Sequence, residues 1–163
     1  MNSEEKNHKE MSGNYGKFFL MLGLSFVAMY ITMYLNTYEW DHVYFSLTRF
    51  YMSSMGIAAM AVIMLSLMLN MYKNKKKNMA IFVGSFLLFV SALGLVRAQA
   101  PIIGDVLWMK AMIPHHSIAI LVSERADIQD PEVKKLAEEI IEAQAREIAQ
   151  MKKMLYRLEN AEK

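Results

Sequence analysis

The chain has 163 residues, of which 55% are hydrophobic and 16 are methionine, and its formal net charge is only +2. The absence of cysteine excludes disulfide bonds and thiolate metal sites. A positive charge this small and scattered does not favour nucleic acid, so no nucleic-acid partner is expected. The apolar residues are concentrated in the first hundred positions, whereas residues 101–163 hold nine Lys and Arg against eleven Asp and Glu. The composition therefore predicts a membrane-embedded front part and a polar rear part.

A polar leader, residues 1–17, precedes three uncharged apolar segments, Phe18–Leu35, Phe50–Tyr72 and Met79–Val96. Each is long enough, as a helix, to cross the hydrocarbon core of a bilayer. No small-residue cleavage pattern follows the first segment, so we expect it to be retained rather than removed as a signal peptide. The sequence therefore predicts an all-α protein in which residues 18–100 form three transmembrane helices in contact with membrane lipid.

The short loops predict the orientation of these helices. The loop KNKKKN, residues 73–78, is rich in lysine, whereas the loop between the first two segments contains Glu39 and Asp41 and no Lys or Arg. Short Lys-rich loops stay in the cytoplasm. We therefore expect a multi-pass protein of the bacterial inner (cytoplasmic) membrane, with a cytoplasmic N-terminus and residues 101–163 outside the cytoplasm.

Methionines recur at spacings of four along the second apolar segment, on one face of the predicted helix. Flexible thioethers beside a glycine are typical of helix packing, and a path for a soft metal ion is the alternative interpretation. The stripe consists of Met52, Gly56, Met60, Met64 and Met68. The isolated histidines His8 and His42 are interpreted as solvated.

Residues 101–163 predict two amphipathic helices that form an antiparallel hairpin. At about 100° per residue, four side chains able to bind metal share one narrow face of the first helix. They are Asp105, Met109, Met112 and His116. His115 lies about 100° away from this face. Pro114 predicts a kink that leaves open which of the two histidines faces the second helix.

The second helix is predicted to begin at Pro131, with Asp130 as its N-cap. Glu147 projects into the predicted apolar stripe, with Gln144 on its border. A carboxylate among apolar side chains costs several kcal/mol unless a partner compensates it. We therefore expect Glu147 and Met151 to face the first helix, with a cation or a protonated His116 as the partner. The predicted apolar stripe consists of Val133, Leu136, Ile140, Ala143, Met151, Met154 and Leu158.

This combination of donors predicts a site for a soft metal ion. Thioether and imidazole donors without thiolate select monovalent copper, with silver as its chemical mimic. Di-iron enzymes of helical bundles need Glu-x-x-His pairs, and His115 and His116 are preceded at that offset by Met112 and Ile113, so we expect a binding protein rather than an enzyme. The alternative is a membrane scaffold or sensor subunit whose outer hairpin binds a protein partner.

The segments DVLWMKAMIPHHSIAI, residues 105–120, and DPEVKKLAEEIIEAQAREIAQMKKML, residues 130–155, together resemble the domain of unknown function 305 family of bacterial proteins. The three-segment front part is similar to the membrane-anchored subgroup of that family. The resemblance implies a ferritin-like helical fold, with copper binding and copper tolerance outside the cytoplasm. A copper-handling protein is an expected partner if the ion is handed over. The family's pattern falls here on Asp105, Met109, Met112, His115, His116, Gln144, Glu147 and Met151.

The sequence departs from the family pattern in one respect. Soluble members of the family commonly contain two such hairpins, whereas this chain has one, which is half of a four-helix bundle. A lone hairpin buries little apolar surface. We therefore expect the outer hairpins of two chains to pair, giving a homodimer or a higher homo-oligomer.

Overall fold

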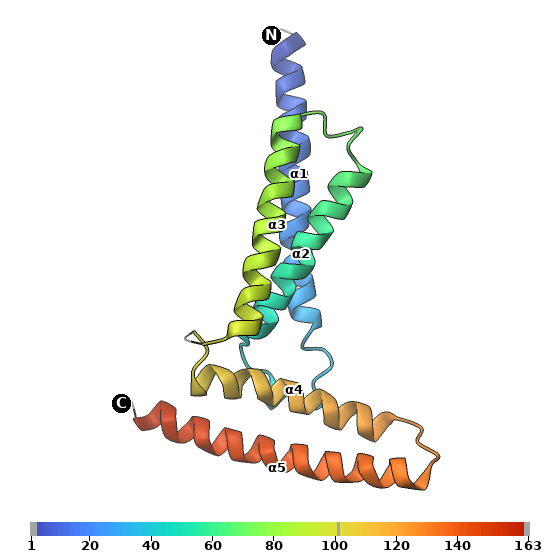
Figure 1. Ribbon diagram of the computed structural model, residues 1–163, viewed down its shortest axis with the longest axis vertical. Helices are drawn as coiled ribbons and strands as arrows, with labels where there is room; N and C mark the ends of the chain where they lie inside the picture. The colour runs from blue at the N-terminus through green and yellow to red at the C-terminus, as the bar shows by residue number, and fades with distance from the viewer. Residues whose placement is uncertain (1–2, 101, 162–163) are drawn as a thin grey trace. The chain divides into compact units, whose positions relative to one another are not determined.

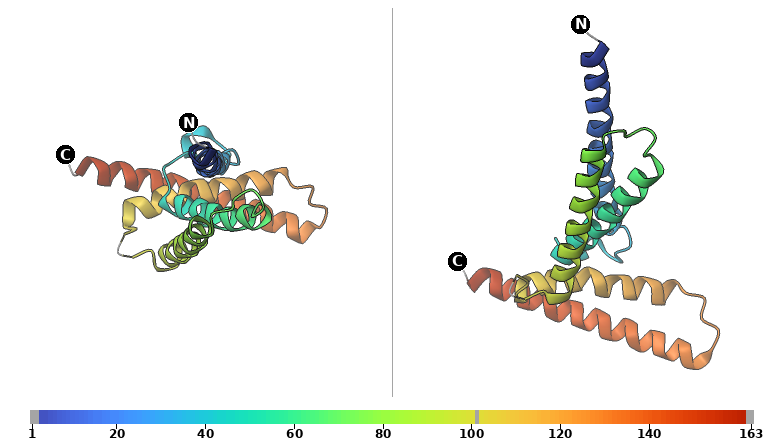
Figure 2. Two further views of the ribbon diagram at one scale, coloured as in Figure 1. Left: turned by 90° about the horizontal axis from the view of Figure 1, so that it is seen from above. Right: turned by 45° about the horizontal axis from the view of Figure 1, so that its top comes forward.

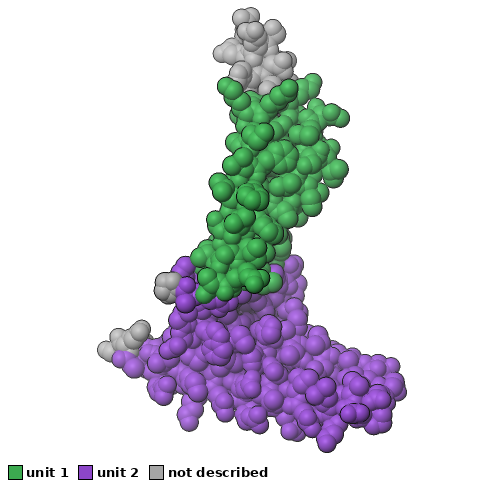
Figure 3. Space-filling model, in the orientation of Figure 1, with its two compact units in different colours: residues 1–31, 50–98 green, residues 32–49, 99–163 purple. Residues whose placement is uncertain are grey.

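The computed structural model describes residues 3–100 and 102–161, with side chains from Tyr15 onward (Figure 1). The described residues form five α-helices, one short 3-10 helix and no strand, so the predicted all-α class is confirmed. The chain divides into two compact units, residues 1–31 with 50–98 and residues 32–49 with 99–163 (Figure 3). The elements are α1 (Ser3–Thr32), η1 (Trp40–His42), α2 (Leu47–Leu67), α3 (Lys75–Ala98), α4 (Asp105–Arg125) and α5 (Pro131–Ala161).

In the first unit, α1, α2 and α3 pack around an aromatic cluster. The ring of Tyr72 lies 5.0 Å from the ring of Tyr15 and 5.4 Å from the ring of Phe18, measured between centroids. The Tyr15 hydroxyl donates a hydrogen bond to Asn78 Oδ1 at 2.5 Å, and the Asn78 amide donates to the Tyr72 carbonyl oxygen at 2.6 Å. These bonds satisfy polar groups that the cluster removes from solvent.

The methionine stripe of α2 takes part in packing within this unit. A Cβ atom at Gly56 would lie only 2.9 Å from the sulfur of Met29, so glycine allows the close approach of α1. Met60, Met64 and Met68 are partly buried against the apolar core, whereas Met52 is 47% exposed. Helix packing therefore accounts for most of the stripe.

Four of the described helical segments are long and apolar enough to cross a membrane, judged by length and composition. They are Tyr15–Thr32, Leu47–Leu67, Lys75–Ala98 and Asp105–Arg125. The first three overlap the predicted spans, but their ends differ. α1 begins at Ser3 within the predicted leader and ends at Thr32, and α2 ends at Leu67, where turns take over. Hydropathy detects uncharged composition, whereas backbone hydrogen bonding sets a helix end, so the predicted ends were wrong by several residues.

In the second unit, α4 and α5 lie side by side and run antiparallel (Figures 1 and 2). Asp130 Oδ1 accepts hydrogen bonds from the backbone N–H groups of Glu132 at 2.9 Å and Val133 at 3.0 Å, so the predicted N-cap is confirmed. α4 continues past Pro114 as one helix. The core shared by the two helices contains Met109, Ile113, Ile120, Ile148, Met151 and Leu155.

The face of α5 that α4 covers differs from the predicted stripe. Val133, Leu136 and Met154 were predicted to be buried, but they are 49%, 55% and 46% exposed. At about 100° per residue, the buried and exposed apolar side chains of α5 form one continuous arc about 160° wide. α4 covers one half of this arc, and the other half lies on the surface of the chain. The buried residues of α5 are Ala137, Ile148, Met151 and Leu155.

Candidate metal centre

A histidine on α4 and a glutamate on α5 form a direct contact between the two helices. His116 Nε2 lies 2.7 Å from Glu147 Oε2. His116 Nδ1 lies 2.9 Å from the carbonyl oxygen of Met112, one turn earlier in α4. Because a carbonyl oxygen only accepts hydrogen bonds, Nδ1 is the donor of this bond. Nε2 is therefore the nitrogen directed at α5, where it binds the carboxylate when protonated and can ligate a metal ion when it is not.

The burial of the two partners is unequal. His116 is 8% exposed, whereas the side chain of Glu147 is 46% exposed because it lies in the half of the apolar arc of α5 that α4 does not cover. Glu147 therefore lies within the predicted apolar stripe, but the expectation that its carboxylate is buried there was wrong. The predicted partner, His116, does contact the carboxylate, so no intervening cation is required for the charge to be compensated.

Three methionines lie in the apolar core between the same two helices. Met109 and Met151 are 4% and 6% exposed, and Met112 packs against the same core as a partly buried side chain. Met109 and Met112 precede His116 on its face of α4, as the predicted spacing requires. The structure therefore brings three thioethers and one imidazole to the interface of α4 and α5.

Other predicted site residues lie outside this interface. Asp105 is exposed as the first residue of α4. His115 is exposed as well, and its ring centroid lies 6.2 Å from that of His116 with an interplanar angle of 66°. Gln144 is partly buried one turn before Glu147. Of the two adjacent histidines, His116 is thus the one that contacts α5.

Comparison with known proteins places this hairpin in a family. Residues 95–162 match the family described as Domain of unknown function (DUF305). A protein of Acanthamoeba polyphaga mimivirus, described as Uncharacterized protein L153, is 34% identical over 139 residues, which cover 83% of this chain and 89% of the viral protein. The chain belongs to the DUF305 family. No solved structure matches it.

The DUF305 match contains all of the described residues of α4 and α5, and the family resemblance predicted from these two segments is confirmed. The similarity to the viral protein is longer than the DUF305 segment, so it includes part of the chain before residue 95. The predicted segments Phe18–Leu35 and Phe50–Tyr72, and most of Met79–Val96, lie in the part of the chain before residue 95.

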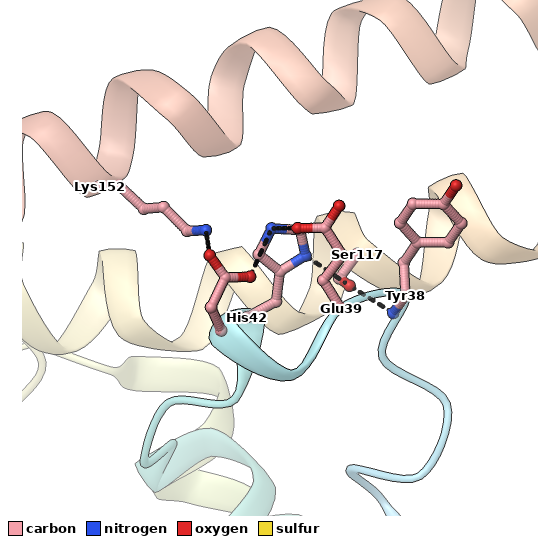
Figure 4. Close-up of polar contacts among 6 residues, drawn as sticks. Tyr38, Glu39, His42, Ser117 and Lys152 are labelled. Carbon is pink, nitrogen blue, oxygen red and sulfur yellow. Dashed lines mark hydrogen bonds and ion pairs between the residues drawn. The ribbon is translucent and has the colours of Figure 1, made fainter.

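Before the DUF305 segment, the loop between α1 and α2 brings a second histidine against α4 (Figure 4). His42 was predicted to be solvated, but it is 5% exposed. Its Nδ1 lies 2.9 Å from Ser117 Oγ, which also accepts a hydrogen bond from the backbone N–H of Tyr38 at 2.7 Å. Burial lowers the pKa of His42, and the positive charge of Lys152 lowers it further, so the neutral imidazole is favoured.

The sequence analysis missed His42 because a loop that docks on a helix leaves no periodic pattern. The signal that was present is the run EWDH, in which two acidic residues stand within three positions of the histidine. The other isolated histidine, His8, lies outside the side chains that the structure describes.

Proposed function

We propose that this DUF305 protein binds a soft monovalent metal ion, copper(I) or silver(I), between α4 and α5. The observation that carries the proposal is that Met109, Met112 and Met151 belong to the apolar core between α4 and α5, the interface at which His116 contacts Glu147. Thioether sulfur and imidazole nitrogen are the donors that monovalent copper prefers when thiolates are absent. The ligands proposed are these three sulfurs and His116 Nε2.

The surroundings of His116 suit a metal ligand. The hydrogen bond from Nδ1 to the Met112 carbonyl oxygen fixes the orientation of the ring and leaves Nε2 directed at α5. Glu147 lies next to Nε2, where a negative charge compensates a bound monovalent cation. When the ion binds, we expect the carboxylate to move from the imidazole toward solvent, which its half-exposed position allows.

A competition titration against a chromogenic copper(I) chelator tests this function on the purified full chain. We expect His116→Ala to weaken copper(I) binding by about tenfold or more, the range that losses at metal sites commonly reach. His115→Ala is the matched control, because His115 is exposed and adjacent in sequence. Equal affinities for His116→Ala and the native protein would contradict the proposal.

The proposed location is a cell membrane, with α1, α2 and α3 as spans and α4 and α5 outside the cytoplasm. The exposed lysines at residues 73–77 support a cytoplasmic position for the α2–α3 loop. Methionine ligands persist in an oxidising compartment where thiols are lost. Since the chain has no cysteine, the variants Lys76→Cys and Glu159→Cys test the orientation in intact cells. An impermeant thiol reagent should label only Glu159→Cys, and the reverse result would contradict this topology.

The surface half of the apolar arc on α5 supports pairing with a second copy of the chain. Val133, Leu136 and Met154 are about half exposed there, and two such faces would complete a four-helix bundle. The same face favours the scaffold alternative, in which a different protein covers it. Light scattering of the detergent-solubilised protein distinguishes the two: we expect a dimer that Leu136→Glu dissociates. A native protein that is already monomeric would contradict self-pairing.

With the metal site outside the cytoplasm, the function proposed is metal tolerance, by sequestering the ion or handing it to a copper-handling protein. Binding without turnover is sufficient for this role, so no catalytic step is proposed.

A further inference from the structure

A second group of metal-binding side chains lies at η1, in the loop between α1 and α2. One ligand atom each from Glu39, Asp41 and His42 lies within 4.8 Å of the other two. His42 Nε2 is 3.6 Å from Glu39 Oε2 and 3.6 Å from Asp41 Oδ1. These distances are too long for hydrogen bonds. They are close to the roughly 3.4 Å that separates two ligands of a tetrahedral zinc ion, each about 2.1 Å from the metal.

The buried imidazole is held so that Nε2 faces the two carboxylates (Figure 4). His42 is 5% exposed, and its Nδ1 is fixed by Ser117 Oγ at 2.9 Å. Among the residues that the structure describes, Nε2 makes no hydrogen bond. Its polar contacts are the two carboxylate oxygens at 3.6 Å, beyond hydrogen-bond distance, and this is a spacing that a shared cation would bridge.

We propose that Glu39, Asp41 and His42 form a binding site for a divalent cation of the zinc type, separate from the soft-metal site at His116. One imidazole and two carboxylates, with no sulfur among them, suit a borderline divalent ion and not monovalent copper. The hydrogen bond between Nδ1 and Ser117 is the kind of outer contact that orients a histidine ligand.

A pocket of about 330 Å³ gives the ion a route to the site and room for a water ligand. Glu39 and His42 line it, together with Lys152, Glu124 and apolar side chains of α4 and α5. Lys152 Nζ lies 2.5 Å from Asp41 Oδ2, while the other oxygen of the same carboxylate faces His42. The lysine therefore leaves one carboxylate oxygen available, but its positive charge opposes the binding of a second cation.

A calorimetric titration of the purified full chain with ZnCl₂ tests the proposal. We expect Glu39→Gln to weaken zinc binding by about tenfold or more, because it removes an anionic ligand. The side chain of Glu39 is 56% exposed, so this variant is expected to fold. Glu142→Gln is the matched control, an exposed glutamate of α5, and should bind zinc as the native chain does. Native affinity in Glu39→Gln would overturn the proposal.

Lys152→Met provides a test in the opposite direction. Removing the neighbouring positive charge should tighten zinc binding several-fold, whereas the exposed control Lys153→Met should leave it unchanged. Cobalt(II), bound in place of zinc, reports the arrangement of the ligands around the metal. The native chain should show the visible absorption bands of a low-symmetry cobalt(II) site, and Glu39→Gln should lose these bands. Weaker zinc binding in Lys152→Met would overturn the proposal.

This site is independent of the proposed copper(I) function, and His116→Ala shows the difference. We expect that variant to keep native zinc affinity. If His116→Ala lost zinc binding while Glu39→Gln retained it, zinc would bind at His116 and not at His42. That result would overturn the inference.

Discussion

His116 and His42 are both buried in the unit that contains the hairpin, but their neighbours differ. His116 shares the interface of α4 and α5 with methionine thioethers and contacts a single half-exposed carboxylate at 2.7 Å. His42 faces two carboxylates at 3.6 Å and has no sulfur among its described contacts. The same imidazole is thus placed in a soft donor set in one case and a harder one in the other. The comparison teaches that the neighbours, and not the histidine, determine which cation each site suits.

The two histidines also share a feature. α4 holds the Nδ1 atom of each ring, through the Met112 carbonyl oxygen for His116 and the Ser117 hydroxyl for His42. Nε2 is left to face one carboxylate in His116 and two in His42. Adjacent turns of one helix therefore orient both candidate ligands. A substitution on α4 can accordingly weaken metal binding at one histidine and leave binding at the other unchanged.

The largest expected effect comes from Ser117→Ala. Ser117 is fully buried and bonds both His42 and the backbone N–H of Tyr38, so the substitution leaves these groups without their partner. We expect the free energy of unfolding to fall by about 1–3 kcal/mol. Zinc binding should weaken while copper(I) binding does not. Thermal unfolding and the two titrations check this, with Ser123→Ala as the control on the same helix.

If Ser117→Ala weakened copper(I) and zinc binding equally, the two histidines would not form separate sites. Unchanged stability and unchanged zinc affinity would show that the Ser117 hydroxyl does not position His42.

A smaller effect is expected from Glu147→Gln. The substitution removes the negative charge beside His116, but the side chain is 46% exposed and water screens its charge. We expect copper(I) affinity to fall only several-fold, less than for His116→Ala, with zinc affinity unchanged. The chelator competition described for His116 measures this. A loss larger than that of His116→Ala would make Glu147 the principal ligand and would contradict the thioether-centred site.

The start of α5 was predictable because local chemistry sets it. Asp130 and Pro131 form a cap and first turn that the sequence shows directly, and the structure has both. The shared face of Met109, Met112 and His116 follows from helical periodicity alone. Local signals were therefore sufficient for the start of α5 and for the shared face of α4.

The buried face of α5 and the role of His42 were not predictable in the same way. The apolar arc of α5 is wider than one helix can cover, and periodicity does not say which half α4 will bury. Val133 and Leu136 are exposed for this reason. His42 is buried because its loop docks on α4 at Ser117, 75 positions later in the chain. Contacts between distant segments leave no pattern in a single sequence.

The most direct test of the soft-metal site compares two methionines of α5. Met151 is 6% exposed in the core with Met109, whereas Met154, three residues later, is 46% exposed. Met→Leu nearly conserves side-chain volume, so each substitution removes a sulfur with little change in packing. In a copper(I) competition titration, Met151→Leu should bind about tenfold more weakly than the native chain. Met154→Leu should bind as the native chain does. Equal affinities for the two variants would contradict a copper(I) site between α4 and α5.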